Sequence, residues 1–463
     1  MSLSLNHTHD STTKSWLASA NQSGQDFSLQ NLPLGVFRRV GSQEPFRGGV
    51  AIGDQVLDLR ALGNWSGLDS TAHTAVLAAS LPALNPLMEL GPNAWRSLRH
   101  CIFGLMSASA SQNTQEALRQ FLVPMDVVEL TMPVKVGNYT DFYTSLHHAH
   151  NVGKLVRPDS PVTPNFHWMP IAYHGRASSV DVGGQGITRP MGQRLNAAGG
   201  APSFGPCERL DYELELGIYI GKGNSRGTRI AAADADSHVF GMCLLNDWSA
   251  RDIQFWEAVP LGPFLAKNFA TSVSPWVVTA EALVPFRKQW QPSPDRPAPL
   301  PYLDSAQTRT SGVLDIQLEV WLTTNSGAPS SRTSRLSHTS FSHQHWTVGQ
   351  MITHHTVGGC NLEIGDLVGT GTVSGPTPEE AGALIELTEA GKRPIRIDAQ
   401  TVRTFLEDGD EVTLKGWCDR SGFARIGFGE CRGVVLPSSQ FTDTDTDTDK
   451  VDASKEVYLE KTN

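Results

Sequence analysis

Apolar and polar positions along the chain follow two rhythms, which separate strand-forming segments from helical ones. In NLPLGVFRRV and GGVAIGDQVLDL (residues 31–59), apolar residues alternate around glycine-containing turns, which predicts short strands. Between residues 68 and 125 the spacing is helical, most clearly in STAHTAVLAASL and NTQEALRQFL. From VPMDVVELTMPV onward, short apolar runs bounded by Gly and Pro predict a second, larger region rich in strands.

These rhythms predict a mainly β protein with a minor α part and two folded units. We place a small N-terminal β domain with a helical segment at residues 31–133 and a larger domain at 134–438. Residues 1–30 are rich in Ser, Thr, Asn, Gln and His, which predicts a flexible arm. Residues 439–463 repeat Asp-Thr and cannot bury a core, so we expect a disordered acidic tail.

Composition and charge limit the partners and the compartment. A net charge of −10 indicates that neither nucleic acid nor an anionic membrane is the main partner. The six cysteines lie far apart without a C-x-x-C pair, which predicts reduced thiols. We find no secretory signal and no apolar run near the ~18 residues of a membrane span. We therefore expect a cytoplasmic protein that does not enter a membrane.

The segment DYELELGIYIG, residues 211–221, places three acids on one side of a predicted strand and apolar residues on the other. Such a row is commonly the solvated face of a sheet, and the segment alone favours this interpretation. Alternatively, Glu213 and Glu215 stand roughly 6.5–7 Å apart at the backbone and converge on one hard cation. A buried pair without a cation would repel, and one carboxylate would take up a proton.

Two further segments concentrate reactive side chains. NYTDFYTSLHHAHNVGKLVR (138–157) contains three histidines, the usual general bases, although the segment alone favours a polar surface turn. NDWSARDIQFWEAVPLGPFLAKNFATSVSPW (246–276) begins with an acid at the end of an apolar strand. Arg251 and Lys267 then supply positive charges that suit an oxyanion or a carboxylate substrate. A salt-bridged loop is the alternative for this second segment.

Eight motifs occur in order along the chain: DFYTSLHHAHNVG, AYHGRASS, RPMGQ, DYELELG, NDWSARDIQFWE, PLGPF, THHTVGGCNLEIGDLVGTGTVSG and DGDEV. Together they resemble the fumarylacetoacetase family over residues 30–437. The resemblance implies a small N-terminal SH3-like barrel, a larger C-terminal mixed β-roll domain and a homodimer. It also implies hydrolysis of a carbon–carbon bond in a small β-diketo acid, giving fumarate and acetoacetate in the last step of phenylalanine and tyrosine breakdown.

The resemblance implies a divalent metal, Ca²⁺ or Mg²⁺, as the cofactor. Its implied ligands are Asp141, Glu213, Glu215 and Asp247. Asp211 matches no ligand, so we expect it to stay outside the metal site. Lys267 and Thr271 match positions that the family associates with the metal. Because an ammonium cannot coordinate a metal, we expect Lys267 to act as an electrostatic donor.

The resemblance also assigns the catalytic and substrate-binding groups. His148, oriented by Glu386, is the implied general base that activates a water molecule. The groups implied to stabilise the oxyanion are Arg251, Gln254 and Lys267. The implied substrate-binding positions are Tyr143, Arg157, Tyr173, Gln254, Ala258 and Thr372.

Ala258 departs from the family pattern. The motif usually reads W-E-Y-V-P-L-G-P-F, whereas this chain reads WEAVPLGPF, so a hydroxyl is lost and the pocket becomes larger. Ala258 therefore favours an alternative function, the transformation of a different β-diketo or acylpyruvate-like acid. A third hypothesis is a non-catalytic scaffold stabilised by a metal, against which the presence of His148, Glu386 and Lys267 speaks.

Overall fold

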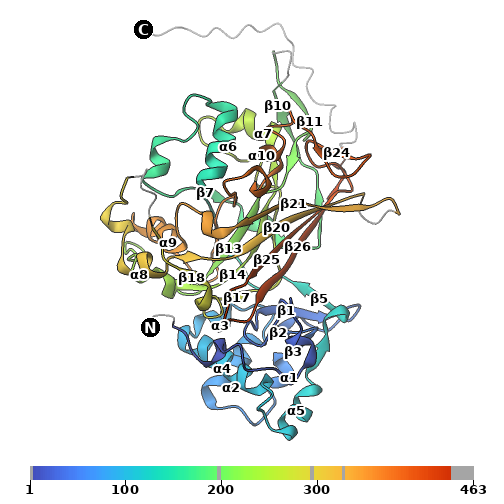
Figure 1. Ribbon diagram of the computed structural model, residues 1–463, viewed down its shortest axis with the longest axis vertical. Coiled ribbons are helices and arrows are strands. Elements are labelled where there is room, and N and C mark those ends of the chain that lie inside the picture. The colour runs from blue at the N-terminus through green and yellow to red at the C-terminus, as the bar shows by residue number, and fades with distance from the viewer. Residues whose placement is uncertain (1–3, 196–199, 292–296, 326–328, 440–463) are drawn as a thin grey trace, which may run out of the picture.

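The chain as a whole contains more strand than helix, which confirms the mainly β fold class expected from the apolar pattern, although helical residues outnumber strand residues in the N-terminal unit. The computed structural model describes residues 4–195, 200–291, 297–325 and 329–439. A smaller N-terminal unit, blue to cyan in Figure 1, lies beneath a larger unit coloured green to red. The predicted boundary at 133/134 falls in the connection between the two units. Most of the tail predicted to be disordered, 439–463, lies outside the described residues.

The N-terminal unit is a five-stranded antiparallel sheet, in the order β4-β3-β2-β1-β5, with helices around it. The strands are β1 (Leu34–Arg39), β2 (Arg47–Ile52), β3 (Gln55–Asp58), β4 (Leu122–Pro124) and β5 (Val128–Thr131). The helices are α1 (Leu59–Leu62), α2 (Ser70–Ala79), α3 (Asn85–Glu89), α4 (Pro92–Met106) and α5 (Gln112–Arg119). Side chains of Asp69 and Ser111 cap α2 and α5, the helices predicted from the spacing. Closure of this sheet into a barrel stays a prediction.

Residues 4–30 do not form the flexible arm that their composition predicts. Arg99 of α4 is buried and donates hydrogen bonds to the Thr8 hydroxyl (3.1 Å) and to the Gln30 carbonyl. Leu29 is buried in the core of the N-terminal unit. The prediction is wrong here because polar side chains of this segment hydrogen-bond to other protein groups. Amino-acid composition does not show whether a polar side chain will bind protein groups or water.

The larger unit contains an eight-stranded sheet and a second, five-stranded sheet. The first has the order β7-β6-β22-β13-β14-β16-β8, with β17 also paired to β14. Its strands are β6 (Tyr139–Tyr143), β7 (Ile171–Gly175), β8 (Val180–Val182), β13 (Leu214–Ile220), β14 (Val239–Asp247), β16 (Thr271–Val273), β17 (Val278–Thr279) and β22 (Leu367–Gly369). The second has the order β21-β20-β25-β26-β9. Its strands are β9 (Gly186–Thr188), β20 (Gln317–Thr324), β21 (Arg332–Ser340), β25 (Glu411–Cys418) and β26 (Ile426–Leu436).

One hydrophobic core joins these two sheets. Leu216 and Leu244 of the first sheet share a buried cluster with Leu318 and Leu414 of the second. On the opposite face, Tyr219 of β13 and Leu245 of β14 belong to the buried cluster of the N-terminal unit, so both strands are buried along their whole length. Polar side chains on these strands must find partners within the protein, since burying an unpaired polar group is costly.

Short strands and helices complete the larger unit. The strands are β10 (Met191–Arg194), β11 (Ser203–Pro206), β12 (Leu210–Asp211), β15 (Ser249–Ala250), β18 (Arg287–Lys288), β19 (Val313–Leu314), β23 (Ile395–Arg396) and β24 (Val402–Arg403). The helices are α6 (Leu146–Val156), α7 (Arg251–Glu257), α8 (Ala306–Ser311), α9 (Val348–Thr356) and α10 (Leu384–Leu387). Helices α6, α7 and α10 lie near one another in the upper part of Figure 1.

Two predictions from composition concern cysteines and membranes. All six cysteines are free, as their spacing predicts. Among the described residues, the helices are too short or too polar to span a bilayer.

Candidate metal centre and active site

Four carboxylates from separate segments meet inside the larger unit. Asp141 lies on β6, Glu215 on β13 and Asp247 at the end of β14, while Glu213 directly precedes β13. One oxygen atom from each lies within 4.8 Å of those of the others, and all four side chains are buried. The two glutamates are thus not the solvated face that the segment alone favoured. The antiparallel pairing of β13 with β14 brings Glu213 and Glu215 beside Asp247.

Gly369 on β22 leaves the space in which two of these acids meet. Strand β22 runs between β6 and β13, and Gly369 pairs with Asp141 in the parallel register. A Cβ atom at Gly369 would collide with Asp141 Oδ1 and lie 3.1 Å from Glu215 Oε2. The missing side chain allows the two carboxylates to approach each other across an intervening strand.

A Gly369→Ala variant should therefore bind Ca²⁺ about tenfold or more weakly, because overpacking of this kind costs roughly 1–3 kcal/mol. Isothermal titration calorimetry would measure the affinity. Gly104→Ala in α4 is the matched control, since a Cβ atom there meets no neighbour within 4 Å. Equal Ca²⁺ affinities for Gly369→Ala and the wild-type protein would contradict this account of Gly369.

The four acids have opposite pKa shifts. Burial raises the pKa of Asp141 and of Glu215 well above ordinary values, and the neighbouring carboxylates raise both further. Burial also disfavours the ionised form of Glu213, but Lys267, Arg251 and His148 outweigh it and lower its pKa to about 2. Burial also raises the pKa of Asp247, although Lys267 opposes the rise. The site therefore holds one stabilised anion beside three carboxyl groups that lack sufficient positive charge.

The donor set fits a divalent cation. Asp141 Oδ1 and Glu215 Oε1 are buried without a hydrogen-bond partner among the described residues. Orphaned buried carboxylate oxygens are costly, and a bound cation would satisfy them. Hard cations such as Ca²⁺ and Mg²⁺ prefer ligand sets made of oxygen atoms.

Lys267 and Arg251 form the positively charged side of the cluster. Lys267 Nζ lies 2.5 Å from Glu213 Oε2 and 2.6 Å from Asp247 Oδ2. Arg251 Nη2 lies 2.8 Å from the other oxygen of Glu213. The Thr271 hydroxyl donates a long, 3.5 Å hydrogen bond to Asp247. Lys267 thus holds two carboxylates as a donor, which is the role its chemistry predicts.

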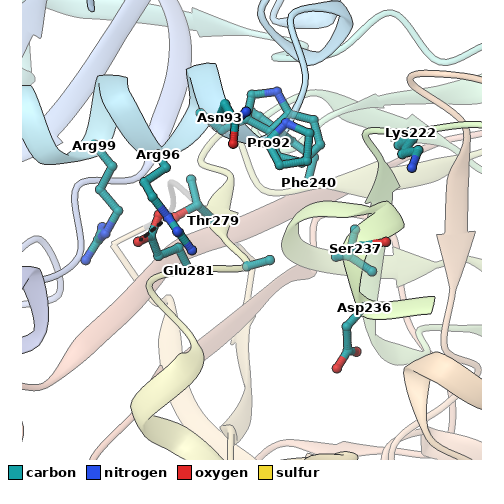
Figure 2. A pocket seen from close by; sticks show the side chains of 13 residues that line it. Pro92, Asn93, Arg96, Arg99, Lys222, Asp236, Ser237, Phe240, Thr279 and Glu281 are labelled. Carbon is teal, nitrogen blue, oxygen red and sulfur yellow. Dashed lines mark ion pairs between the residues drawn. The ribbon is translucent and has the colours of Figure 1, made fainter. Parts of the chain in front are cut away.

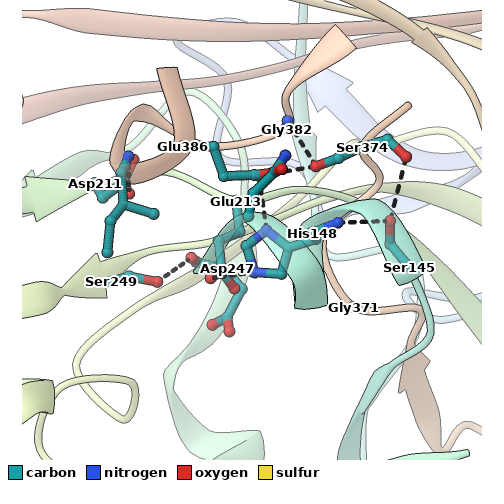
Figure 3. A network of polar contacts seen from close by, with 12 residues as sticks. Ser145, His148, Asp211, Glu213, Asp247, Ser249, Gly371, Ser374, Gly382 and Glu386 are labelled. Carbon is teal, nitrogen blue, oxygen red and sulfur yellow. Dashed lines mark hydrogen bonds and ion pairs between the residues drawn. The ribbon is translucent and has the colours of Figure 1, made fainter. Parts of the chain in front are cut away.

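His148 and Glu386 form a buried pair beside the acids (Figure 3). His148 Nδ1 lies 2.7 Å from Glu386 Oε1, and His148 Nε2 lies 3.9 Å from Glu213 Oε1. The pair joins α6 to α10 across 238 residues of sequence. Ser145 caps α6 by accepting a hydrogen bond from the His148 amide.

Glu386 is held as an anion. Burial alone would raise its pKa, but the interaction with His148 and hydrogen bonds from His148, Asn151 and Ser374 lower it. An ionised carboxylate only accepts hydrogen bonds, so His148 carries its proton on Nδ1. Nε2 is then the basic nitrogen, and it faces the acidic cluster.

The predicted substrate-binding residues surround this centre to different degrees. The Tyr143 ring lies edge-on to His148 at 5.3 Å, and the Tyr173 hydroxyl donates to Asp247 Oδ2 at 3.0 Å. The Thr372 hydroxyl is buried with no partner among the described residues. Gln254 Oε1 accepts from Arg251 Nη1 at 3.1 Å.

The remaining two predicted residues lie at the ends of helices. Arg157 is exposed at the end of α6 and donates to the Pro161 carbonyl. Ala258 is partly buried and forms the C-cap of α7, where its amide donates to the Gln254 carbonyl.

Three residues of the site were not predicted from the sequence. Asn151 and Ser374 donate hydrogen bonds to Glu386, and Gly369 leaves space between Asp141 and Glu215. All three lie in or beside motifs quoted for the resemblance, and that proximity is the signal that would have found them.

Two cavities differ in their relation to these residues. One of about 200 Å³ is lined by Tyr139, Tyr173 and Lys267 and so borders the acidic cluster. A larger one of about 310 Å³ lies between α4 and β14, where Arg96 Nε is 3.5 Å from Glu281 Oε1 (Figure 2). The larger cavity contains none of the predicted site residues. The smaller cavity is therefore the one of these two that the predicted site residues line.

Comparisons with known proteins match both units. The fumarylacetoacetase N-terminal family matches residues 30–133, and the fumarylacetoacetate (FAA) hydrolase C-terminal family matches residues 138–436. Fumarylacetoacetase of Oryza sativa is 45% identical over 424 residues, covering 90% of this chain and 96% of the relative. Fumarylacetoacetase of Homo sapiens is 44% identical over 418 residues, covering 89% of this chain and 97% of the relative.

Proposed function

The chain belongs to the fumarylacetoacetase family, and from this premise we propose that it hydrolyses fumarylacetoacetate to fumarate and acetoacetate, the last step of phenylalanine and tyrosine breakdown. The observation that carries the proposal is the His148–Glu386 pair, 2.7 Å apart, whose free nitrogen faces four buried carboxylates. A base and a candidate cation site thus lie side by side in one buried centre.

The first step is the activation of water. His148 Nε2 accepts a proton from a water molecule, which attacks the carbonyl carbon next to the bond that breaks. Glu386 keeps the imidazole in the required tautomer and stabilises the imidazolium that forms. Because the reaction uses water directly, it needs no serine or cysteine nucleophile.

The second step is stabilisation of the tetrahedral oxyanion. Arg251 and Lys267 supply fixed positive charge in a buried site. The Gln254 oxygen accepts from Arg251, so its amide N–H groups are free to donate to the substrate. A divalent ion held by Asp141, Glu213, Glu215 and Asp247 would supply Lewis acidity toward the diketo oxygens of the substrate.

The third step breaks the carbon–carbon bond. The electron pair of that bond leaves with the acetoacetate fragment as an enolate, while the attacked carbon becomes the new carboxyl group of fumarate, which ionises by releasing its proton to the solvent. The imidazolium of His148 returns its proton to the carbon of the enolate, which restores the base. Tyr143, Tyr173 and Thr372 are placed to orient the substrate around this sequence of steps.

The proposal extends to a cytoplasmic homodimer that uses Ca²⁺ or Mg²⁺. The loop 259–264 supports the dimer, because Leu261 is 96% exposed and Val259 and Phe264 are also largely exposed. Exposed apolar clusters of this kind commonly mark protein interfaces.

A turnover assay tests the proposed function. Purified protein supplied with Ca²⁺ is incubated with fumarylacetoacetate, and fumarate and acetoacetate are quantified as products. We expect equimolar formation of both, and formation slower by about 10²-fold or more from a His148→Ala variant. A wild-type protein that is loaded with metal but forms neither product would refute the proposal.

Ala258 supports a second candidate, the transformation of a bulkier β-diketo or acylpyruvate-like acid. Ala258 follows Gln254 by one helical turn, so a side chain at position 258 lies on the same side of α7 as Gln254. The short side chain leaves room beside a proposed substrate-binding residue.

An Ala258→Tyr variant should therefore discriminate against substrates with longer acyl groups. We expect its kcat/KM for an elongated β-diketo acid to fall by about 10- to 200-fold, the usual range for steric discrimination in a pocket. Its kcat/KM for fumarylacetoacetate should be retained. Steady-state kinetics with both substrates measure the ratio, and an unchanged ratio would exclude position 258 as a determinant of specificity.

A further inference from the structure

Asp211 is a fully buried acid that the proposed mechanism does not use. It shares sequence parity with Glu213 and Glu215 but is not among the four acids that meet in the cluster. The strand is interrupted between β12, which ends at Asp211, and β13, which begins at Leu214. Asp211 is therefore free to point away from the acids and toward α10.

We propose that Asp211 is a positioning residue that holds the helix carrying Glu386 and the guanidinium of Arg251 in one arrangement. The inference rests on the proposed function, since it assigns Asp211 a part in preparing that site. Figure 3 shows Asp211 beside the short helix and apart from the His148 ring.

The Asp211 carboxylate accepts four hydrogen bonds, from α10, from Arg251 and from the next residue in the chain. Oδ1 accepts hydrogen bonds from the amides of Leu384 (2.8 Å) and Tyr212 (2.8 Å). Oδ2 accepts from the Ile385 amide (3.0 Å) and from Arg251 Nε (2.9 Å). Each oxygen therefore bonds to one amide of α10, and one of them also bonds to Arg251.

Helix α10 depends on this distant acid for its cap. Its N-cap residue, Ala383, has no side-chain acceptor, so the first amides of the helix lack a local partner. Asp211 satisfies the amides of Leu384 and Ile385 from another segment of the chain. Because Glu386 lies in the same single turn, displacement of the turn would move the carboxylate that orients His148.

Arg251 is held by three different groups. Its Nε donates to Asp211, its Nη1 donates to Gln254, and its Nη2 pairs with Glu213. Without Asp211, the guanidinium would be free to turn about its remaining contacts. One buried carboxylate thus connects the orientation of the base to the orientation of an oxyanion donor.

The Asp211→Asn variant tests this role with little change in shape. Either orientation of the amide places an NH₂ group against two hydrogen-bond donors, so α10 or Arg251 must shift. Because a misplacement of about 1 Å commonly costs about 10²-fold in rate, we expect kcat to fall by about that factor, with KM changed less than about threefold.

Asp410→Asn is the matched control. Asp410 is equally buried and accepts hydrogen bonds from Arg403 Nε (2.8 Å), Arg403 Nη2 (3.0 Å) and the Glu407 amide (2.9 Å). It contacts none of the proposed site residues through these bonds. We expect a similar loss of thermal stability in both variants, but a normal kcat only in Asp410→Asn.

A double-mutant cycle separates positioning from general destabilisation. Since Asp211 acts through Glu386 and Arg251, adding Asp211→Asn to Glu386→Gln should lower kcat less than it does in the wild-type protein. Independent multiplication of the two losses, or an equal loss in Asp410→Asn, would overturn the proposal.

A spectroscopic readout does not depend on turnover. In histidine-labelled protein, the low-field proton resonance of His148 Nδ1–H reports its hydrogen bond to Glu386. It should shift or broaden in Asp211→Asn and stay unchanged in Asp410→Asn. An unchanged resonance together with a wild-type kcat in Asp211→Asn would refute the positioning role but not the proposed function. If the wild-type protein were inactive but Asp211→Asn still shifted the resonance, only the proposed function would be refuted.

Discussion

Replacement of His148 by glutamine should lower kcat for fumarylacetoacetate hydrolysis by about 10²- to 10⁴-fold, the usual contribution of a general base. Glutamine keeps a polar side chain of similar reach but has no nitrogen that accepts a proton near neutral pH. The variant would lack the His148 nitrogen that takes a proton from water, while Glu386 and the four carboxylates would remain in place. KM should change little, because the residue acts on water and not on substrate binding.

The matched control is His147→Gln. His147 is the preceding residue of α6, and its ring lies 6.1 Å from that of His343. Among the described residues, the histidine that is hydrogen-bonded to Glu386 is His148 and not His147. Steady-state kinetics and calorimetric Ca²⁺ titration of both variants would show a loss of kcat only for His148→Gln, with Ca²⁺ affinity retained. A His148→Gln enzyme that hydrolyses the substrate at the wild-type rate would contradict the mechanism.

Removal of the divalent cation should abolish activity and lower the unfolding temperature. Two carboxyl groups of the cluster have buried oxygens without a hydrogen-bond partner among the described residues, and a cation would satisfy them. Binding to the folded state alone, at a free cation concentration 100 times the Kd, adds about 2.7 kcal/mol to the free energy of unfolding. Calorimetric unfolding of the chelated and the Ca²⁺-loaded protein measures this difference.

The same site predicts a pH dependence of cation affinity. Burial and neighbouring carboxylates raise the pKa of Asp141 and Glu215, so both groups hold protons more tightly than exposed acids do. A cation needs the ionised forms and must displace those protons. Affinity should therefore rise with pH through the raised pKa values, and binding should release protons.

Titrations in two buffers with different ionisation enthalpies would count the released protons. A Glu215→Gln variant, which lacks one of the two groups, should release fewer protons and bind the cation more weakly. Comparison of Ca²⁺ with Mg²⁺ under the same conditions would identify the preferred ion. If metal-free protein, verified by elemental analysis, kept full activity and the same unfolding temperature, the cation would have no role at this site.

Much of the local structure follows from the sequence, because side-chain periodicity is a local property. The helical spacing at 68–125 contains α2, α4 and α5, and the apolar runs of the larger unit contain β13, β14 and β25. The motifs also pointed to His148 and to the four acids, since those residue types stand at the family's positions. Composition alone was misleading for residues 4–30, where polar side chains bind protein groups in place of water.

Local pattern does not reveal what covers a strand. The alternation of acids at 211, 213 and 215 predicted that all three lie on one face of a strand. In the structure the strand is interrupted after Asp211, whose side chain accepts a hydrogen bond from α10. Glu213 and Glu215 instead meet Asp141 and Asp247. The pairing of His148 with Glu386, 238 residues apart, likewise depends on how α6 and α10 pack.

The sequence by itself therefore determined which segments form strands and helices and which reactive side chains are available. Only the tertiary structure decided that Glu213 and Glu215 are buried together and that Asp211 caps a helix. The physical reason is that periodicity specifies which side chains share a face, whereas charge, pKa and ligand binding depend on the groups that distant segments bring to that face.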